Sequence, residues 1–211
     1  MVRIYDSVRV TRDDGAELAF HASSGIDAVG LLPDGRVIVS EARGWIRVYG
    51  PGGAVQGNIE IPVRLTTFRY QDTHLVALPS YAGDATLPLV IDLDRYRIAA
   101  QLVGHVGQVF SARWVAGGRV LTAGADGTAR LWNAATGQLV QTYRGGPRFL
   151  ADATISDGLV IGGDADGLLR FWDVKSGAKL WTLKAHKSAV IRIHVQDGDL
   201  VTRGYAGEIS R

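Results

Sequence analysis

The chain has 211 residues, 46% of them hydrophobic, which is enough to fill a sizeable core. Its 23 basic and 21 acidic residues nearly cancel to a net charge of +2, a balance that argues against a dedicated nucleic-acid binder. It has no cysteine, which excludes disulfides, thiolate metal sites and cysteine nucleophiles. No stretch approaches roughly 18 apolar residues, and residues 1–6 lack the apolar core of a signal peptide. We therefore expect a soluble, cytoplasmic or otherwise intracellular protein that binds neither membrane nor nucleic acid.

A strand with a large apolar residue at its end recurs every 40 to 42 residues along the chain. These strand ends are Tyr49, Ile91, Trp132 and Trp172. Residues 204–211 show the same pattern and stop one residue before the next expected aromatic. A period near forty predicts a repeat fold. We expect five repeats, at about 22–61, 62–103, 104–144, 145–184 and 185–211.

Within each repeat the local pattern predicts four short strands joined by tight turns. In the third repeat the expected strands are 109–114, 119–122, 128–132 and 138–143, and glycine-containing turns separate them. Many strand residues are apolar on both faces, so each unit must bury its faces against its neighbours. Four-stranded units of about forty residues do this by packing radially, as the blades of a β-propeller. The predicted fold class is all-β, with four-stranded antiparallel blades.

Two repeats share a set of short motifs. Residues 104–105 are Gly-His, residues 126–127 are an Asp-Gly turn, and Trp132-Asn133 ends the strand that follows. One period later, Asp-Gly at 166–167 and Trp-Asp at 172–173 repeat the turn and the strand end. These motifs resemble those of the WD40 repeat proteins. The resemblance covers essentially the whole chain and is weakest over 62–101, where we expect irregular strands.

The resemblance also implies a buried tetrad of His, Ser or Thr, Asp and Trp in a repeat. In the third repeat the matching residues are His105, Thr122, Asp126 and Trp132. In such a set the carboxylate orients the imidazole, which contacts the hydroxyl, which accepts from the indole N–H. The other repeats match it only in part. The fourth keeps Asp166 and Trp172 but has Gly162 at the hydroxyl position, and the last keeps His186 and Thr202 but has Ala206 at the Asp position.

Some of the same residues also suggest chemistry. His105, Asp126 and Thr122 have the residue types of a base, its orienting carboxylate and a nucleophile, but the structural tetrad accounts for all three. His186 and His194 lack a third metal ligand at a recognisable spacing. Asp92, Asp94, Asp164 and Asp166 lie at strand ends and turns, where Asp is favoured for turn chemistry. An arginine recurs two residues before three of the strand ends, at Arg47, Arg130 and Arg170, and we expect its stem packed and its head solvated. We expect no catalysis, cofactor or metal.

The resemblance further implies that partners dock where the loops before the first strands and the turns between the second and third strands open on one face. The residues of this chain at those positions that we expect to bind a partner are Arg43, Arg64, Arg148, Lys187 and Tyr205, and Tyr81 holds an equivalent position. Arginine and tyrosine are favoured interface anchors, and converging basic residues favour an acidic partner segment. We expect a non-catalytic scaffold for protein–protein interaction. The alternative is a ligand-binding or enzymatic propeller that holds a sugar or other small molecule at its central channel.

The two ends of the chain predict how the ring closes. The last repeat has three candidate strands and lacks a fourth, and residues 15–20 resemble residues 137–142, the fourth strand of the third repeat. Residues 1–21 would then complete the last blade and make 1–211 a single five-bladed domain. Residues 2–6 resemble a third strand, however, which leaves one strand too many. A segment of a longer propeller, or completion by a second chain, therefore stays open.

Overall fold

A computed structural model of the chain describes residues 7–11, 17–22, 24–80 and 87–210. The regular elements in these ranges are β-strands, and their sheets are built of antiparallel pairs. No helix in the described part is long and apolar enough to cross a membrane. The chain divides into two compact units, one made by residues 1–80 and 89–99 and the other by 81–88 and 100–211. The predicted all-β fold class is confirmed.

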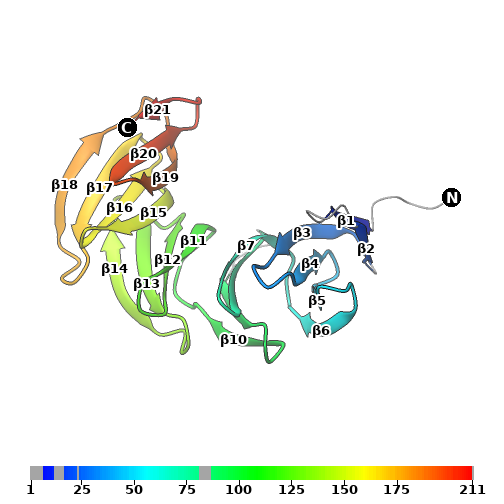
Figure 1. Ribbon diagram of the computed structural model, residues 1–211. Helices are drawn as coiled ribbons and strands as arrows, with labels where there is room; N and C mark the ends of the chain where they lie inside the picture. Colours follow the sequence, from blue (N-terminus) through cyan, green and yellow to red (C-terminus); the bar gives the residue numbers. More distant parts are fainter. Residues whose placement is uncertain (1–6, 12–16, 23, 81–86, 211) are drawn as a thin grey trace. The chain divides into compact units, whose positions relative to one another are not determined.

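Most of the first ten strands belong to the first unit (Figure 1). A two-stranded sheet consists of β1 (Ser7–Thr11) and β2 (Glu17–His21). The first four-stranded sheet has the order β3 (Ile26–Leu31), β4 (Val37–Glu41), β5 (Trp45–Tyr49) and β6 (Val55–Glu60). The second consists of β7 (Leu65–Gln71), β8 (His74–Pro79), β9 (Leu89–Asp92) and β10 (Arg97–Gln101). This second sheet is formed by the repeat in which we expected irregular strands, yet its strand order is the same as in the other four-stranded sheets.

The second unit contains the other three sheets, each again in chain order. One consists of β11 (Val109–Val115), β12 (Arg119–Gly124), β13 (Thr128–Asn133) and β14 (Leu139–Arg144). The next consists of β15 (Leu150–Ser156), β16 (Leu159–Asp164), β17 (Leu168–Asp173) and β18 (Lys179–Lys184). The last has the three strands β19 (Val190–Gln196), β20 (Asp199–Gly204) and β21 (Ile209–Ser210).

Turn chemistry explains why the strands end where they do. Gly127 has a φ of +71°, and a Cβ on it would lie 2.1 Å from the carbonyl oxygen of Gly146, so only glycine fits this turn. The strands predicted in the third repeat correspond to β11–β14, with bounds that differ by no more than two residues. In each of the five repeats, a β-bulge follows the first residue of the first strand.

Neighbouring sheets of the second unit pack face to face through apolar side chains. One core cluster joins Leu121 and Tyr143 of the third repeat to Leu150 and Trp172 of the fourth. Two polar contacts cross the same boundary. The Tyr143 hydroxyl donates to the carbonyl oxygen of Val174 at 2.7 Å, and the Trp172 indole donates to that of Arg144 at 3.2 Å. The strand-end aromatic of one blade therefore covers the fourth strand of the blade before it.

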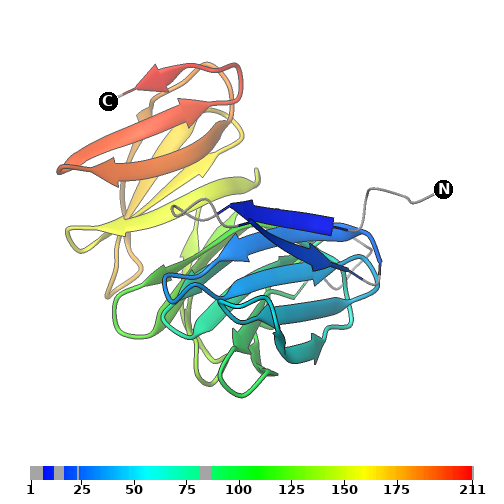
Figure 2. The ribbon, with the colours of Figure 1, turned by 45° about the vertical axis from the view of Figure 1, so that its right-hand side comes forward.

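The N-terminal hairpin lies beside the β3–β6 sheet in the first unit (Figure 2), and its side chains make the same kind of contact. Phe20 of β2 is buried, its ring centroid lies 4.8 Å from that of Tyr49, and the Tyr49 hydroxyl donates to the carbonyl oxygen of His21 at 3.2 Å. β2 therefore packs on the β3–β6 blade in the way that β14, the fourth strand of its own blade, packs on β15–β18. Its register partner is β1. The third-strand candidate at residues 2–6 lies outside the described residues, and closure of the last blade by residues 1–21 stays a prediction.

Candidate functional site

The structure brings the four candidate tetrad residues of the third repeat into one hydrogen-bonded chain. The His105 ring places Nδ1 3.0 Å from both carboxylate oxygens of Asp126 and Nε2 2.7 Å from the Thr122 hydroxyl. The Trp132 indole donates to the same hydroxyl at 2.8 Å. Strands β12 and β13 hold the hydroxyl and the indole, and the loops before β11 and β13 hold the imidazole and the carboxylate.

The Asp126 carboxylate has more donors than the tetrad alone supplies. It also accepts from the backbone N–H of Val106 and Thr128, from the Thr128 hydroxyl at 2.8 Å and from Arg130 at 3.2 Å. Burial by itself would raise the pKa of Asp126. The hydrogen bonds from His105 and Thr128 outweigh that effect and hold the pKa well below its ordinary value. The site therefore keeps a buried carboxylate ionised.

The burial of these residues argues against the interpretation of His105, Asp126 and Thr122 as a base, its orienting carboxylate and a nucleophile. A nucleophile must reach its substrate, but Thr122 is 0% exposed and the His105 side chain 1% exposed. The Thr122 hydroxyl is surrounded by His105, Trp132 and the carbonyl oxygen of Arg130. This arrangement satisfies buried polar groups and presents none of them to a cleft.

The fourth repeat is built differently from the partial tetrad that its sequence suggests. Trp172 is fully buried, but its indole donates to the Arg144 carbonyl because Gly162 offers no hydroxyl. The Asp166 side chain is 51% exposed and lies 3.7 Å from Arg148. The buried carboxylate of this blade is instead Asp164, 1% exposed, which accepts from two backbone N–H groups and from both Nε and Nη2 of Arg170. Asp164 therefore has a structural role well beyond that of a turn residue.

The recurring arginine proves to be an ion-pair partner, which corrects the expectation of a solvated head. Arg170 pairs with Asp164 at 2.6 Å and Arg130 with Asp126 at 3.2 Å. In the first blade Arg47 pairs with the buried Glu41 at 2.8 Å. In the first and fourth blades the acid stands eight residues before the strand-end aromatic, and in the tetrad blade it stands six before. The arginine is constant while the acid moves by two positions.

The last repeat keeps half of the tetrad. His186 and Thr202 are both buried, and the imidazole Nε2 lies 2.8 Å from the hydroxyl. Ala206 supplies no carboxylate, and its backbone N–H donates to Ser188, whose hydroxyl donates to Glu208 at 2.8 Å. That hydrogen bond from Ser188 lowers the pKa of Glu208.

Sequence reasoning missed an ion pair that joins the innermost strands of three repeats. Asp152 of β15 is 3% exposed and accepts from Arg113 of β11 at 2.7 and 2.8 Å. The same carboxylate accepts from the backbone N–H of Ile193 in β19 at 2.8 Å, and Arg113 donates to the Ile193 carbonyl at 3.3 Å. An aspartate among apolar residues of an inner strand was the only signal.

In each unit, backbone hydrogen bonds bring together the loops that carry the expected partner-binding residues. The turn at Gly127 accepts from Gly145, the turn at Gly167 from His186, and Tyr205 donates to Ala189. In the first unit Ile61 donates to Gly44 and Ser80 donates to Arg64. The loop before a first strand and the turn between second and third strands therefore lie at the same end of the sheets.

The five expected partner-binding residues, Arg43, Arg64, Arg148, Lys187 and Tyr205, are exposed. Two of them have acidic neighbours. Arg64 makes a bidentate contact with Asp27, a hydrogen bond that raises the pKa of the guanidinium, and Arg148 lies near Asp166. Tyr205 is 75% exposed. Tyr81 lies outside the described residues.

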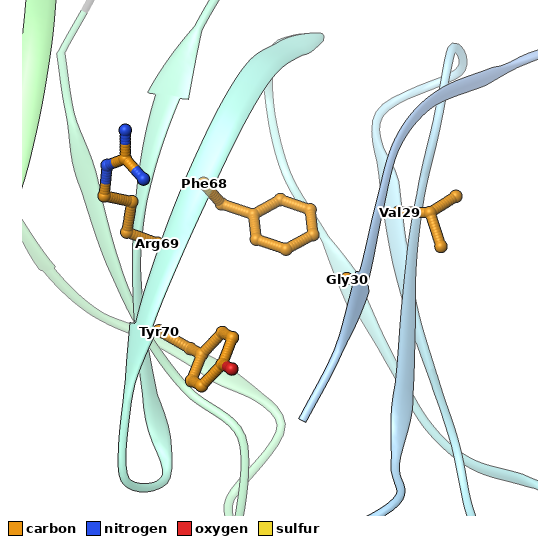
Figure 3. Close-up of a pocket in the computed structure, with 5 residues that line it drawn as sticks. All are labelled: Val29, Gly30, Phe68, Arg69 and Tyr70. Carbon is orange, nitrogen blue, oxygen red and sulfur yellow. The ribbon is translucent and has the colours of Figure 1, made fainter. Parts of the chain in front are cut away.

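A pocket of about 310 Å³ lies on the innermost strands of the two four-stranded sheets of the first unit (Figure 3). Val29, Gly30, Phe68, Arg69 and Tyr70 line it, and this lining includes neither a carboxylate nor an imidazole. Phe68 points toward Gly30, where a Cβ would come within 2.5 Å of its ring, while Arg69 points away. In the described part of the chain no three His, Asp or Glu residues are grouped to hold a metal ion.

Comparisons with known proteins identify the repeat. The model of the family described as "WD domain, G-beta repeat" matches residues 97–133. The WD repeat-containing protein RUP2 of Arabidopsis thaliana is 43% identical over 47 residues, which are 22% of this chain and 13% of that protein. The matched region thus spans only a small part of the relative's length.

Solved structures with little sequence identity share the fold. The WD40 β-propeller domain of Doa1 aligns with a TM-score of 0.68 at 19% identity, covering 94% of this chain and 69% of that one. BamB from Moraxella catarrhalis aligns with a TM-score of 0.70 at 15% identity, covering 94% and 65%. Both likenesses concern the fold alone. The family match thus identifies a WD40 repeat at residues 97–133, and the whole chain resembles WD40 β-propellers in its fold.

Proposed function

We propose that the chain is a non-catalytic scaffold that binds another protein through the loops at one end of its blades. The observation that carries the proposal is the exposure of Arg148, Lys187 and Tyr205 on loops that backbone hydrogen bonds hold at one end of the sheets of the second unit, and of Arg43 on the corresponding turn of the first unit. Domains of the WD40 family generally bind other proteins. A rigid set of sheets that presents variable loops suits recognition better than chemistry.

The charges on these loops favour an acidic segment of the partner. Lys187 and Arg43 are exposed, whereas Arg64 is already paired with Asp27. Tyr205, in the same unit as Lys187 and Arg148, is 75% exposed and offers an anchor with an apolar body and a polar tip. We therefore expect Arg64 to contribute less than the other four.

The test is charge reversal with matched controls. A partner is isolated by affinity pulldown, and its binding to the full chain is measured by calorimetry at several salt concentrations. The triple variant Arg43→Glu/Arg148→Glu/Lys187→Glu should weaken binding and reduce its salt dependence. The exposed residues Glu60 and Asp94 provide the controls, as Glu60→Lys and Asp94→Lys, which should leave binding unchanged. Protection of only the opposite loop ends from hydrogen exchange in the complex would contradict the proposal.

A further inference from the structure

The β-bulge of each repeat leaves one residue outside the regular pairing of its first strand. In the third repeat this residue is Phe110, between the paired residues Val109 and Ser111. In the first repeat the same place is held by Asp27. A bulge re-aims the side chain of its extra residue, and in both repeats that side chain reaches the blade that follows.

The residue that it meets there stands immediately before the first strand of the next repeat. Asp27 accepts from Arg64, the residue before β7, with the guanidinium Nε 3.1 Å from a carboxylate oxygen. Phe110 packs on Phe149, the residue before β15, with ring centroids 5.3 Å apart and the ring planes tilted by 57°. One position between blades therefore holds an ion pair in the first unit and an aromatic pair in the second.

The aromatic pair of Phe110 and Phe149 is open to solvent and is not required for the packing of blades. Phe110 is 38% exposed and Phe149 is half-buried. At the next boundary, between the fourth and fifth repeats, the equivalent residues are Ala151 and Ala189. Blades thus pack with an ion pair, two rings or two methyl groups at this position. Exposed aromatic side chains at such a variable position are typical anchors for an apolar side chain of a partner.

Basic side chains lie on the loops that carry or neighbour this pair. Arg148 directly precedes Phe149, and its side chain is 65% exposed. Lys187, in the loop of the next repeat, is also exposed. The acidic neighbour of Arg148 is Asp166, 3.7 Å away and 51% exposed. Because an exposed ion pair of this length contributes little, a carboxylate of a bound segment can replace Asp166 beside Arg148.

We propose that Phe110 and Phe149 bind one large apolar side chain, preferably aromatic, of a partner segment whose flanking acidic residues meet Arg148 and Lys187. The proposal rests on the docking role proposed above and specifies the residue that the partner must carry. Contact with the two rings removes apolar area of both molecules from water, and the flanking charges orient the segment. An acidic segment without such a side chain would be attracted to these loops but held weakly.

The probe for this site is a fluorescein-labelled peptide with one phenylalanine between two pairs of glutamates. With the full chain, fluorescence anisotropy should show saturable binding, and amide exchange should slow over residues 148–151. A peptide with alanine in place of the phenylalanine should bind roughly tenfold more weakly or worse, because it loses the contact with the rings. A peptide with lysines in place of the glutamates should lose at least as much.

Variants of the chain assign the binding to the aromatic pair. Phe110→Ala and Phe149→Ala should each weaken binding of the phenylalanine peptide by roughly tenfold and leave that of the alanine peptide unchanged. Phe110→Asp/Phe149→Arg installs the ion pair that Asp27 and Arg64 form at the equivalent position, so it removes the rings and keeps a contact between the blades. It should also abolish the preference for phenylalanine. Leu139→Ala, at a residue of β14 that is 46% exposed, is the control and should leave binding unchanged. Thermal melting checks that each variant is folded.

The preference for phenylalanine separates this proposal from the docking role on which it rests. If Arg43→Glu/Arg148→Glu/Lys187→Glu weakens partner binding but Phe110→Ala leaves partner binding and the peptide preference unchanged, the aromatic anchor is wrong and the docking role stands. If the triple variant leaves partner binding unchanged, the docking role itself is wrong. Absence of saturable binding, equal binding of the alanine peptide, or protection confined to other strands would overturn the proposal. A dimeric mass that Phe110→Ala abolishes would identify a second copy of the chain as the occupant and would overturn it as well.

Discussion

The indole N–H of Trp132 donates to the hydroxyl of Thr122 across 2.8 Å in the interior of the third blade. The hydroxyl is held in turn by His105, and His105 by Asp126. Removing the carboxylate leaves the imidazole and four further donors without their acceptor. We predict that Asp126→Ala lowers the free energy of unfolding by about 1–3 kcal/mol, measured by urea titration.

Asp166→Ala is the matched control for that measurement. It occupies the corresponding turn position of the fourth repeat, but its side chain is half exposed, so its loss should change stability by no more than about 0.5 kcal/mol. Equal losses from the two variants would show that the tetrad does not stabilise the blade.

Acid should destabilise the protein through Asp126. Because its pKa in the folded chain lies below the ordinary 3.8, its contribution is complete above that pH. The contribution is lost progressively as the pH falls below 3.8, because the unfolded chain then binds more protons than the folded one. Asp126→Asn should show a shallower fall in melting temperature over this range than the wild type. Parallel profiles would mean that other carboxylates govern acid unfolding.

The ion pair of Asp164 and Arg170 should carry more stability than the sequence suggests. Asp164→Ala leaves a guanidinium whose side chain is only 12% exposed without its carboxylate, and we predict a loss on the order of 3 kcal/mol. The double variant Asp164→Ala/Arg170→Met should recover part of that loss because it removes the stranded charge. A double variant no better than Asp164→Ala would argue against the pair as the cause.

Alkali should act on the boundary between the third and fourth blades. Burial raises the pKa of Tyr143 to about 12, so the stability that its neutral form provides is complete below pH 10 and is lost as the pH rises toward 12. Tyr143→Phe removes the bond to Val174 and should cost about 1 kcal/mol. Titration of tyrosinate absorbance in both proteins checks the assignment, and Tyr70→Phe, at a half-exposed residue, should cost almost nothing.

Closure of the last blade by residues 1–21 can be tested by deleting them. Deleting residues 1–21 uncovers Tyr49 whether or not the ring is closed, because Phe20 packs on it, so a loss of stability alone decides nothing. Hydrogen exchange is more specific. If residues 1–21 complete the last blade, deletion should speed exchange in β20 and β21 as well as in β4 and β5. Faster exchange in β4 and β5 alone would favour an open segment, as would a native mass above one chain.

The sequence was sufficient to predict the strands because glycine and aspartate turns act over a few residues. Asp126 and Gly127 determine the turn between β12 and β13 whatever the position of the blade in the fold. The Arg113–Asp152 pair was out of reach, because its members are 39 residues apart and meet only through the packing of neighbouring blades. Asp164 and Asp166 differ by two positions in the chain, yet one is buried and one exposed. Only the three-dimensional turn shows which carboxylate points inward.

Gly162 has a consequence for how the repeats diverge. A Cβ at this position would lie 3.0 Å from the Trp172 ring, closer than an ordinary contact, so a threonine there would have to displace the indole. Its hydroxyl would also find no imidazole, since Gly146 stands at the histidine position. Replacing the Asp164–Arg170 pair of this blade by a His-Thr-Asp-Trp tetrad would therefore pass through an intermediate sequence with an unsatisfied buried group. The polar interiors of the third and fourth blades are therefore chemically distinct, and such a difference disfavours the pairing of strands from the wrong blades during folding.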